Sequence, residues 1–120
     1  MASLPHAHGP ESAQTFDHMP KNEKFLIISD IFKQLADPTR IRIFWLLCHC
    51  EECVINLSAL MDMSSPAVSH HLKQLRSSGL ITSHRDGKEV YYKAAKTAQA
   101  KLLHDMIENM VEITCPNEQM

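Results

Sequence analysis

Residues 64–94 restrict the possible fold more than any other segment, because a helical repeat there leads directly into a hairpin signal. In PAVSHHLKQLRSSG, the apolar residues Val68, Leu72 and Leu75 recur at helical spacing. The β-prone runs ITSHR and VYYKA follow, and an Asp-Gly pair at 86–87 joins them. Asp-Gly between two such runs is a strong signal for a tight β-hairpin. The segment therefore predicts a helix followed by a two-stranded hairpin.

Helices are also expected on both sides of this segment. A first helix is predicted from about Lys21 to Ala36, and a second over TRIRIFWLLCHC, where Asp37-Pro38 provides an N-cap and a proline at the first helical position. A short helix around Leu57 and a last helix from about Lys96 to Thr114 complete the set. The expected buried stripe of the second helix consists of Ile41, Phe44, Trp45 and Cys48.

These elements predict a mostly helical α+β protein with about five helices and a two-stranded hairpin, which is the set of parts of a winged helix-turn-helix. A length of 120 residues suits one small domain. We expect a flexible, histidine-containing arm over residues 1–20, the winged domain over 21–115 and a tail over 116–120. The first helix has two apolar faces, which is typical of a helix that contacts both its own core and a partner subunit.

No apolar run approaches ~18 residues, and the N-terminus lacks a basic start followed by an apolar core. We therefore expect a cytoplasmic protein without membrane contact. In that compartment clustered cysteines more often bind metal or react than form structural disulfides.

The charge is unevenly distributed. Residues 64–93 contain five Lys or Arg and two acids, a net charge of +3, whereas the whole chain has a net charge of −2. A positive segment of this kind indicates a surface for a polyanion. Groups able to bond base edges or phosphates lie on the same segment: Ser65, Ser69, His70, His71, Lys73, Gln74, Arg76, Arg85 and Lys88. The alternative from pattern alone is a solvated amphipathic helix beside a surface hairpin.

Three stretches decide between these interpretations: IFKQLADPTRIRIFWLL, ECVINLSALMDMSSPAVSHHLKQLRSSGLI and HRDGKEVYYKA. Together they resemble the ArsR/SmtB family of winged-helix repressors over about residues 30 to 93. The resemblance implies a homodimer joined through the first and last helices. It also implies binding to an inverted repeat of double-stranded operator DNA in the chain's own operon, and weaker binding when an inducer is present. The DNA-contact positions that it implies are Ser64, Ser65, Ser69, His70, His71, Arg85 and Lys88.

The family has a metal site on the last helix, and the positions that correspond to its ligands here are Lys96, Ala98, Asn109 and Glu112. Only Glu112 matches, so a site of that type is expected to be absent. His104 and Glu108 are four residues apart on the same helix, which is compatible with a surface ion pair or with the remnant of a metal pair.

A second family site uses a Cys-Val-Cys-Asp-Leu stretch, which reads Cys-Val-Ile-Asn-Leu here from Cys53 onward. Two further thiols, Cys48 and Cys50, lie just upstream in CHCEEC. Cys48, Cys50 and Cys53 are therefore the candidate metal ligands, for a thiophilic ion such as Zn(II), Cd(II), Pb(II), As(III) or Cu(I). Possible additional ligands are His49, Cys115, His6 and His8.

The predicted function is a repressor of its own operon that metal binding at this cluster releases from DNA. Three alternatives remain: a thiol-redox or persulfide-responsive repressor of the same fold, cysteines that are incidental to function, and a metal carrier that does not bind DNA. An enzyme is not expected, because the chain has no nucleophile turn and no Gly-rich phosphate loop.

Overall fold

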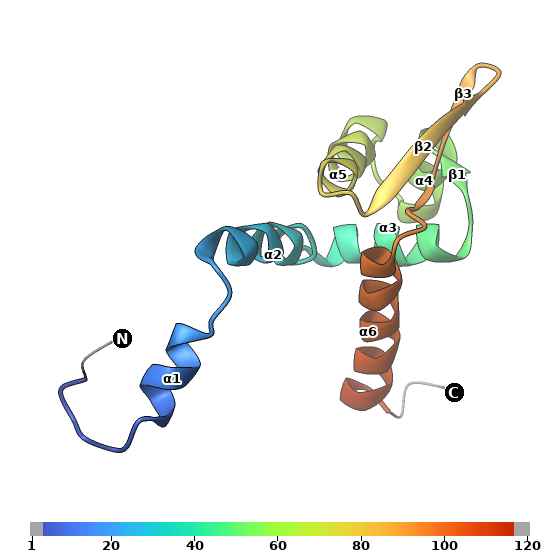
Figure 1. Cartoon of the computed structure of the whole chain (residues 1–120). Helices are drawn as coiled ribbons and strands as arrows, with labels where there is room; N and C mark the ends of the chain where they lie inside the picture. The colour runs from blue at the N-terminus through green and yellow to red at the C-terminus, as the bar shows by residue number, and fades with distance from the viewer. Residues whose placement is uncertain (1–3, 117–120) are drawn as a thin grey trace.

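The computed structural model describes residues 4–116, which form six helices and a three-stranded antiparallel sheet (Figure 1). The helices are α1 (Glu11–Asp17), α2 (Asn22–Gln34), α3 (Pro38–His49), α4 (Val54–Met61), α5 (Ser65–Ser77) and α6 (Ala98–Thr114). The strands are β1 (Glu52–Cys53), β2 (Ile81–Asp86) and β3 (Glu89–Ala94), in the sheet order β1-β3-β2. This arrangement is a winged helix-turn-helix, and the fold prediction is confirmed.

Two elements add to the predicted set. The short strand β1 pairs with β3 in the register Cys53 with Tyr91, so the hairpin is part of a three-stranded sheet. Within the expected N-terminal arm, residues 11–17 form α1, which lies apart from the other helices in Figure 1. None of the helices in the described part of the chain is long and apolar enough to cross a membrane.

The core lies between α3, α4, α5 and the start of the sheet. Its fully buried side chains are Ile43, Phe44, Leu57, Val68, Leu72, Leu75, Leu80 and Ile81. Burial of these apolar side chains is the main stabilising contribution to the fold. It also places α5 against both α3 and α4, so that the two helices of the helix-turn-helix, α4 and α5, pack together on the side of α3.

The predicted buried stripe of α3 is only partly correct. Phe44 is fully buried, but Trp45 is 39% exposed and Ile41 is half-buried, while Ile43 and Leu47 occupy the core instead. Apolar residues cover most of the circumference of α3, so periodicity does not fix its rotation about its axis. Packing against α5 and β3 decides that rotation.

The start of α3 joins three helices through one side chain, Arg40. The Asp37 carboxylate caps α3 by accepting from the backbone N–H of Arg40 at 2.8 Å. The Arg40 guanidinium donates through Nη1 to the Gln34 side-chain oxygen at 3.0 Å and through Nε to Nδ1 of His71 at 3.2 Å. The end of α2 and the middle of α5 are therefore both fixed to the start of α3.

Candidate functional site

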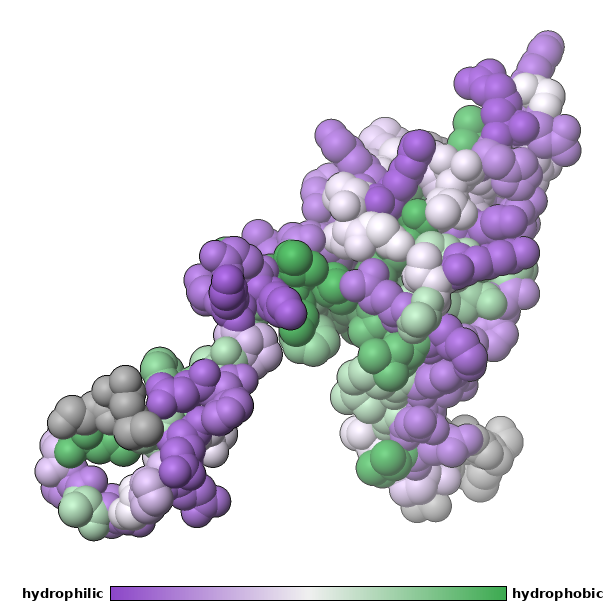
Figure 2. Space-filling model, in the orientation of Figure 1, coloured by the Kyte–Doolittle hydropathy of each residue, from purple (hydrophilic) through white to green (hydrophobic). Residues whose placement is uncertain are grey.

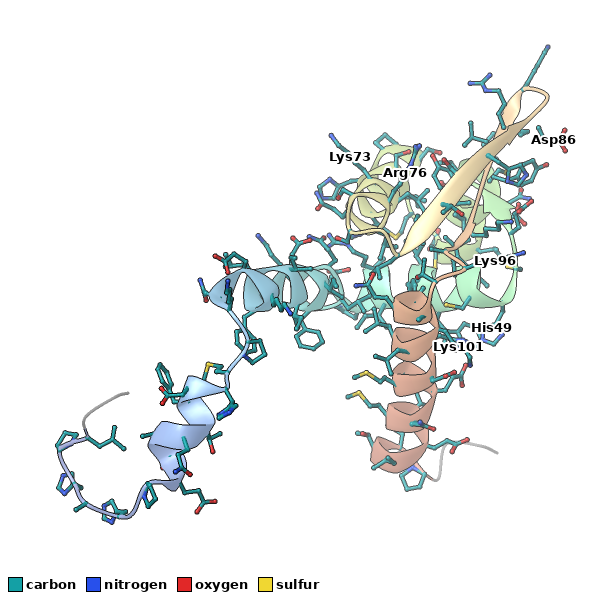
Figure 3. The ribbon with its side chains drawn as sticks, viewed as in Figure 1. His49, Lys73, Arg76, Asp86, Lys96 and Lys101 are labelled. Atoms are coloured by element: carbon teal, nitrogen blue, oxygen red, sulfur yellow. The ribbon has the colours of Figure 1, made fainter. Side chains whose placement is uncertain are left out.

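Helix α5 presents a polar face to solvent because its apolar residues are used for the core. Its N-cap is Ser64, whose hydroxyl accepts from the backbone N–H of Ala67 at 3.3 Å. Val68, Leu72 and Leu75 are buried, at most 1% exposed. The opposite face carries Ser69, His70, Lys73 and Arg76, all exposed. In Figure 3, Lys73 and Arg76 extend outward from α5.

Four of the predicted DNA-contact side chains on or next to α5 are less available for contact than the sequence suggests, because they bond within the protein or are partly buried. Ser64 is the helix cap, and the hydroxyl of Ser65 lies 3.2 Å from that of Ser58. His71 points back toward α3, where its Nδ1 accepts from Arg40 and its side chain is only 14% exposed. Burial, followed by the charge of Arg40, lowers the pKa of His71. Gln74 is half-buried. Fewer of the predicted DNA-contact residues on α5 are therefore freely exposed than the sequence pattern indicated.

The β2–β3 hairpin forms the wing. Its tip is the Asp-Gly turn, where Gly87 adopts a φ of +64°, a left-handed conformation that glycine takes without a Cβ clash. Arg85 and Lys88 flank the turn and are exposed. The wing extends beyond α5, with Asp86 near its end in Figure 3. The predicted wing bases thus lie on an accessible projection next to the exposed face of α5.

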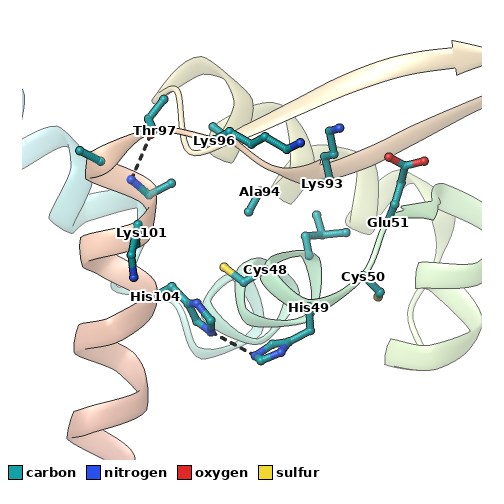
Figure 4. A pocket seen from close by; sticks show the side chains of 14 residues that line it. Cys48, His49, Cys50, Glu51, Lys93, Ala94, Lys96, Thr97, Lys101 and His104 are labelled. Atoms are coloured by element: carbon teal, nitrogen blue, oxygen red, sulfur yellow. Dashed lines mark hydrogen bonds between the residues drawn. The ribbon is translucent and has the colours of Figure 1, made fainter.

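The three clustered thiols lie close in the chain but occupy different environments. Helix α3 ends at His49, and Cys50 follows as its C-cap in an extended conformation. Cys48 and Cys50 both line the cleft between the end of α3 and the start of α6, but Figure 4 shows their side chains pointing in different directions. The thiol of Cys50 donates to the Leu46 carbonyl oxygen at 3.4 Å, and Cys53 is buried at the sheet edge. Within residues 4–116, these thiols do not form a group of converging ligand atoms.

Burial acts strongly on Cys48. Together with the nearby carboxylate of Glu108, it raises the pKa of Cys48 to about 11. The free thiol therefore stays protonated at neutral pH, and a metal ion that bound it would first have to displace this proton. All four cysteines of the chain are free thiols.

The possible additional ligands lie in three different parts of the chain. The rings of His6 and His8 stack on each other in the N-terminal segment, with centroids 5.8 Å apart. Cys115 follows the end of α6 and is half-buried. Only His49 adjoins the thiol cluster, and its side chain turns toward α6 (Figure 4).

At that contact the structure brings together His49, His104 and Glu108, which sequence reasoning did not combine. Nε2 of His49 lies 3.1 Å from Nε2 of His104 and 3.2 Å from Oε1 of Glu108. Nε2 of His104 lies 3.1 Å from the same oxygen, which also accepts from Nε1 of Trp45 at 2.8 Å. These hydrogen bonds lower the pKa of Glu108, and the bond from Trp45 has the largest effect. The i, i+4 spacing of His104 and Glu108 was visible in the sequence, but the contribution of His49, 55 residues away from His104, was not.

Comparison with known proteins identifies the family. The model of the "Bacterial regulatory protein, arsR family" matches residues 37–83. The Synechocystis "Transcriptional repressor SmtB homolog" is 38% identical over 71% of this chain and 64% of its own length. The Mycobacterium tuberculosis "HTH-type transcriptional repressor SmtB" is 33% identical over 82% of this chain and 73% of its own length. The Listeria innocua "Cadmium resistance transcriptional regulatory protein CadC" is 42% identical over 54% of this chain and 56% of its own length. The chain thus spans between about half and three quarters of these relatives.

Solved structures agree on the fold. The homodimeric winged helix-turn-helix DNA-binding domain of a possible ArsR-family regulator from Mycobacterium bovis superimposes with a TM-score of 0.70 at 22% identity, covering 86% of this chain and 96% of that one. The order of helices and strands, the exposed face of α5 and these relatives lead to the same conclusion. The chain belongs to the arsR family of bacterial regulatory proteins and has their winged helix-turn-helix fold.

Proposed function

We propose that this protein is a repressor of its own operon that binds operator DNA as a homodimer and leaves the DNA when its thiol cluster binds a metal ion. The observation that carries the DNA-binding part is the exposed polar and basic face of α5 beside the wing. A helix of this composition enters the major groove and contacts base edges, while wing bases contact the phosphate backbone. The exposed contacts are Ser69, His70, Lys73, Arg76, Arg85 and Lys88.

The proposed dimer uses α2 and α6. Each helix exposes a row of large apolar side chains that the monomer leaves uncovered, and Figure 2 shows hydrophobic surface on both. The exposed apolar residues are Phe25, Leu26, Ile27, Ile28 and Phe32 on α2, with Leu102, Met106, Met110, Val111 and Ile113 on α6. Large apolar side chains left exposed in these numbers favour association. A two-fold dimer would present two α5 helices to successive turns of the major groove.

The proposed inducer is a thiophilic metal ion held by Cys48, Cys50 and Cys53. The name of the cadmium-resistance relative and the three thiols within six residues support this assignment. Because the thiols face different directions in the free protein, binding requires residues 50–53 to move. These residues lead from α3 through β1 to α4, which packs on α5, so the movement would alter how α5 sits on α3. A coupling of about 1–3 kcal/mol between the ion and DNA is enough for a 5- to 150-fold change in affinity.

The test is fluorescence anisotropy of labelled DNA taken from immediately upstream of the gene. The reduced, metal-free protein is titrated at fixed salt, since phosphate contacts make affinity strongly salt-dependent. Cd(II), Pb(II), As(III), Zn(II) and Cu(I) are then added anaerobically. We expect tight binding and release by one of these ions. Cys50→Ser should keep the DNA affinity and lose the release, whereas the control Cys115→Ser should behave as wild type.

The outcomes distinguish the alternatives. Release of the wild type by a polysulfide but by no ion would identify a thiol-redox or persulfide-responsive repressor in place of the metal sensor. Equal metal release of Cys50→Ser and wild type would remove the thiol cluster as the sensor. Absence of specific DNA binding in the metal-free protein would contradict the repressor itself and favour a metal carrier.

A further inference from the structure

The end of α3 meets α6 at a compact group of three potential metal ligands. The ligand atoms are Nε2 of His49, Nε2 of His104 and Oε1 of Glu108. They form a nearly equilateral triangle with sides of 3.1, 3.1 and 3.2 Å. Among the side chains of residues 4–116, one group of three or more His, Cys, Asp or Glu residues has ligand atoms that converge, and it is this one. It contains no thiol and is separate from the thiol ligands proposed above.

The dimensions of this triangle suit a small divalent ion. Zn(II) binds imidazole nitrogen and carboxylate oxygen at about 2.0–2.2 Å, so the ligand atoms of a tetrahedral site lie about 3.3–3.6 Å apart. In an octahedral site, adjacent ligand atoms at about 2.1 Å from the ion lie about 3.0 Å apart. The observed sides fall between these values. An ion about 1 Å out of the plane would reach all three atoms with little movement of the side chains.

The hydrogen-bond pattern also favours a cation at this point. The two Nε2 atoms face each other and the same carboxylate oxygen, so two imidazoles compete for one acceptor that Trp45 already occupies. A cation bound to both Nε2 atoms and to the carboxylate oxygen would replace this competition with three favourable bonds. It requires each histidine to be neutral with Nε2 unprotonated, which is the ordinary state of a metal-bound imidazole.

Trp45 supplies the kind of outer contact that metal sites use. Its indole N–H donates to the ligand oxygen of Glu108 at 2.8 Å, and its ring packs on the His49 ring with centroids 4.2 Å apart. Donors of this type orient a carboxylate ligand and affect metal affinity. His49 and Glu108 both have side chains 45% exposed, so an ion can enter from solvent and keep water in its remaining coordination positions.

We infer that His49, His104 and Glu108 form a binding site for a divalent first-row transition ion, with Zn(II) as the expected ligand. Two imidazoles and one carboxylate match the preferences of Zn(II), Co(II) and Ni(II), whereas As(III) and Pb(II) prefer thiolates. The bound ion joins the C-terminal end of α3 to α6. Because α3 also supports α5, occupancy links a helix of the proposed dimer surface to the support of the DNA-facing helix. The site itself does not depend on the proposed thiol sensor.

The experiment measures metal binding without DNA. Reduced, chelator-treated full-length protein is titrated with Zn(II) in competition with a chromophoric chelator, and with Co(II) by absorption. Trp45 is the single tryptophan of the chain, so its fluorescence reports occupancy of this site directly. We expect one ion per chain to bind at this site, with a change in Trp45 emission that saturates when this site is filled. In Cys50→Ser, which removes a thiol ligand, Co(II) bound at this site should show no sulfur-to-cobalt charge-transfer absorption.

Variants locate the ion. His49→Gln and His104→Gln should each weaken binding by at least about tenfold, because each removes a ligand. His84→Gln is the matched control, since His84 is also exposed and paired with a glutamate, Glu51, but has no third ligand. Trp45→Phe should keep the one-ion stoichiometry with weaker affinity, which shows that the three ligands still assemble. Circular dichroism checks that each variant is folded.

Three results would overturn the inference. The first is Zn(II) affinity in His49→Gln and His104→Gln equal to that of the wild type. The second is a Trp45 emission change on metal binding that disappears in Cys50→Ser, which would place the reporting ion on the thiols. The third is loss of binding only when His6 and His8 are replaced, which would place it on the N-terminal segment. Metal binding at the histidines without any effect on DNA affinity would support this site, because the site does not depend on release from DNA.

Discussion

The surface proposed to face DNA and the end of α3 differ in how they are built. The first consists of α5 and the wing, each of which follows from a local pattern: an apolar stripe, a serine cap and an Asp-Gly turn. The second combines Cys48, His49 and Cys50 at the end of α3 with His104 and Glu108 of α6, so it depends on contacts between distant segments. Surfaces of the first kind can be identified from sequence, whereas assemblies of the second kind appear only when helices pack.

Leu72 and Lys73 are adjacent on α5, but we expect their substitution to affect the stability of the fold very differently. Leu72 is 1% exposed in the core and Lys73 is exposed on the opposite face. We expect Leu72→Ala to lower the free energy of unfolding by about 2–5 kcal/mol, because it removes buried methyl groups and leaves a cavity. Lys73→Ala should change it by no more than about 0.5 kcal/mol. Urea unfolding followed by circular dichroism measures both, and equal losses would contradict the assigned faces.

Thiol reactivity separates the two cysteines at the end of α3. Cys50 is exposed, whereas Cys48 is half-buried with a pKa of about 11. Because the thiolate is the nucleophile, we expect iodoacetamide at pH 8 to modify Cys48 more than about tenfold more slowly than Cys50. The rate at Cys48 should rise with pH up to about 11 as its thiolate fraction increases. Peptide mass spectrometry over time measures the order, and faster labelling of Cys48 would contradict its described environment.

Lys73 and Arg76 test whether the exposed face of α5 contacts the phosphate backbone. Each substitution to alanine should weaken DNA binding several-fold and reduce the salt slope of the affinity by about 1, because one phosphate contact is lost. The weakening should be similar on operator and unrelated DNA. Anisotropy at several salt concentrations measures it, with Lys101→Ala as a control, since Lys101 lies on α6 in an ion pair with Asp105. An unchanged salt slope would show that these bases do not contact DNA.

The smallest expected effect concerns pH and His71. Its pKa is lowered in the folded state, so below the ordinary histidine pKa of about 6.5 the unfolded chain binds more protons than the folded one. Stability should therefore be complete above about pH 6.5 and decrease as pH falls below it. Protonation of Nδ1 also breaks the bond from Arg40. His71→Asn should flatten this part of the profile, whereas His70→Asn, which alters the exposed neighbour, should not. Thermal unfolding across pH 5–8 measures the difference.

Much of the fold could be predicted because its signals are local. Asp37 and Ser64 act as helix caps, and the turn at Gly87 has the positive φ that an Asp-Gly hairpin requires. The rotation of α3 could not be predicted, because its apolar residues surround most of the helix. The strand β1 is only two residues long and forms by pairing with β3, so no alternating pattern announces it.

For the candidate sites, the sequence by itself determined the family, the basic segment and the presence of three thiols near the end of α3. The tertiary structure decided where the side chains point. It turned His71 toward Arg40, directed Cys48 and Cys50 apart, and brought His49 to His104 and Glu108 across 55 and 59 residues of chain. The physical reason is that periodicity and turn chemistry act over a few residues, whereas the meeting of ligand atoms depends on how α3 and α6 pack around the shared core.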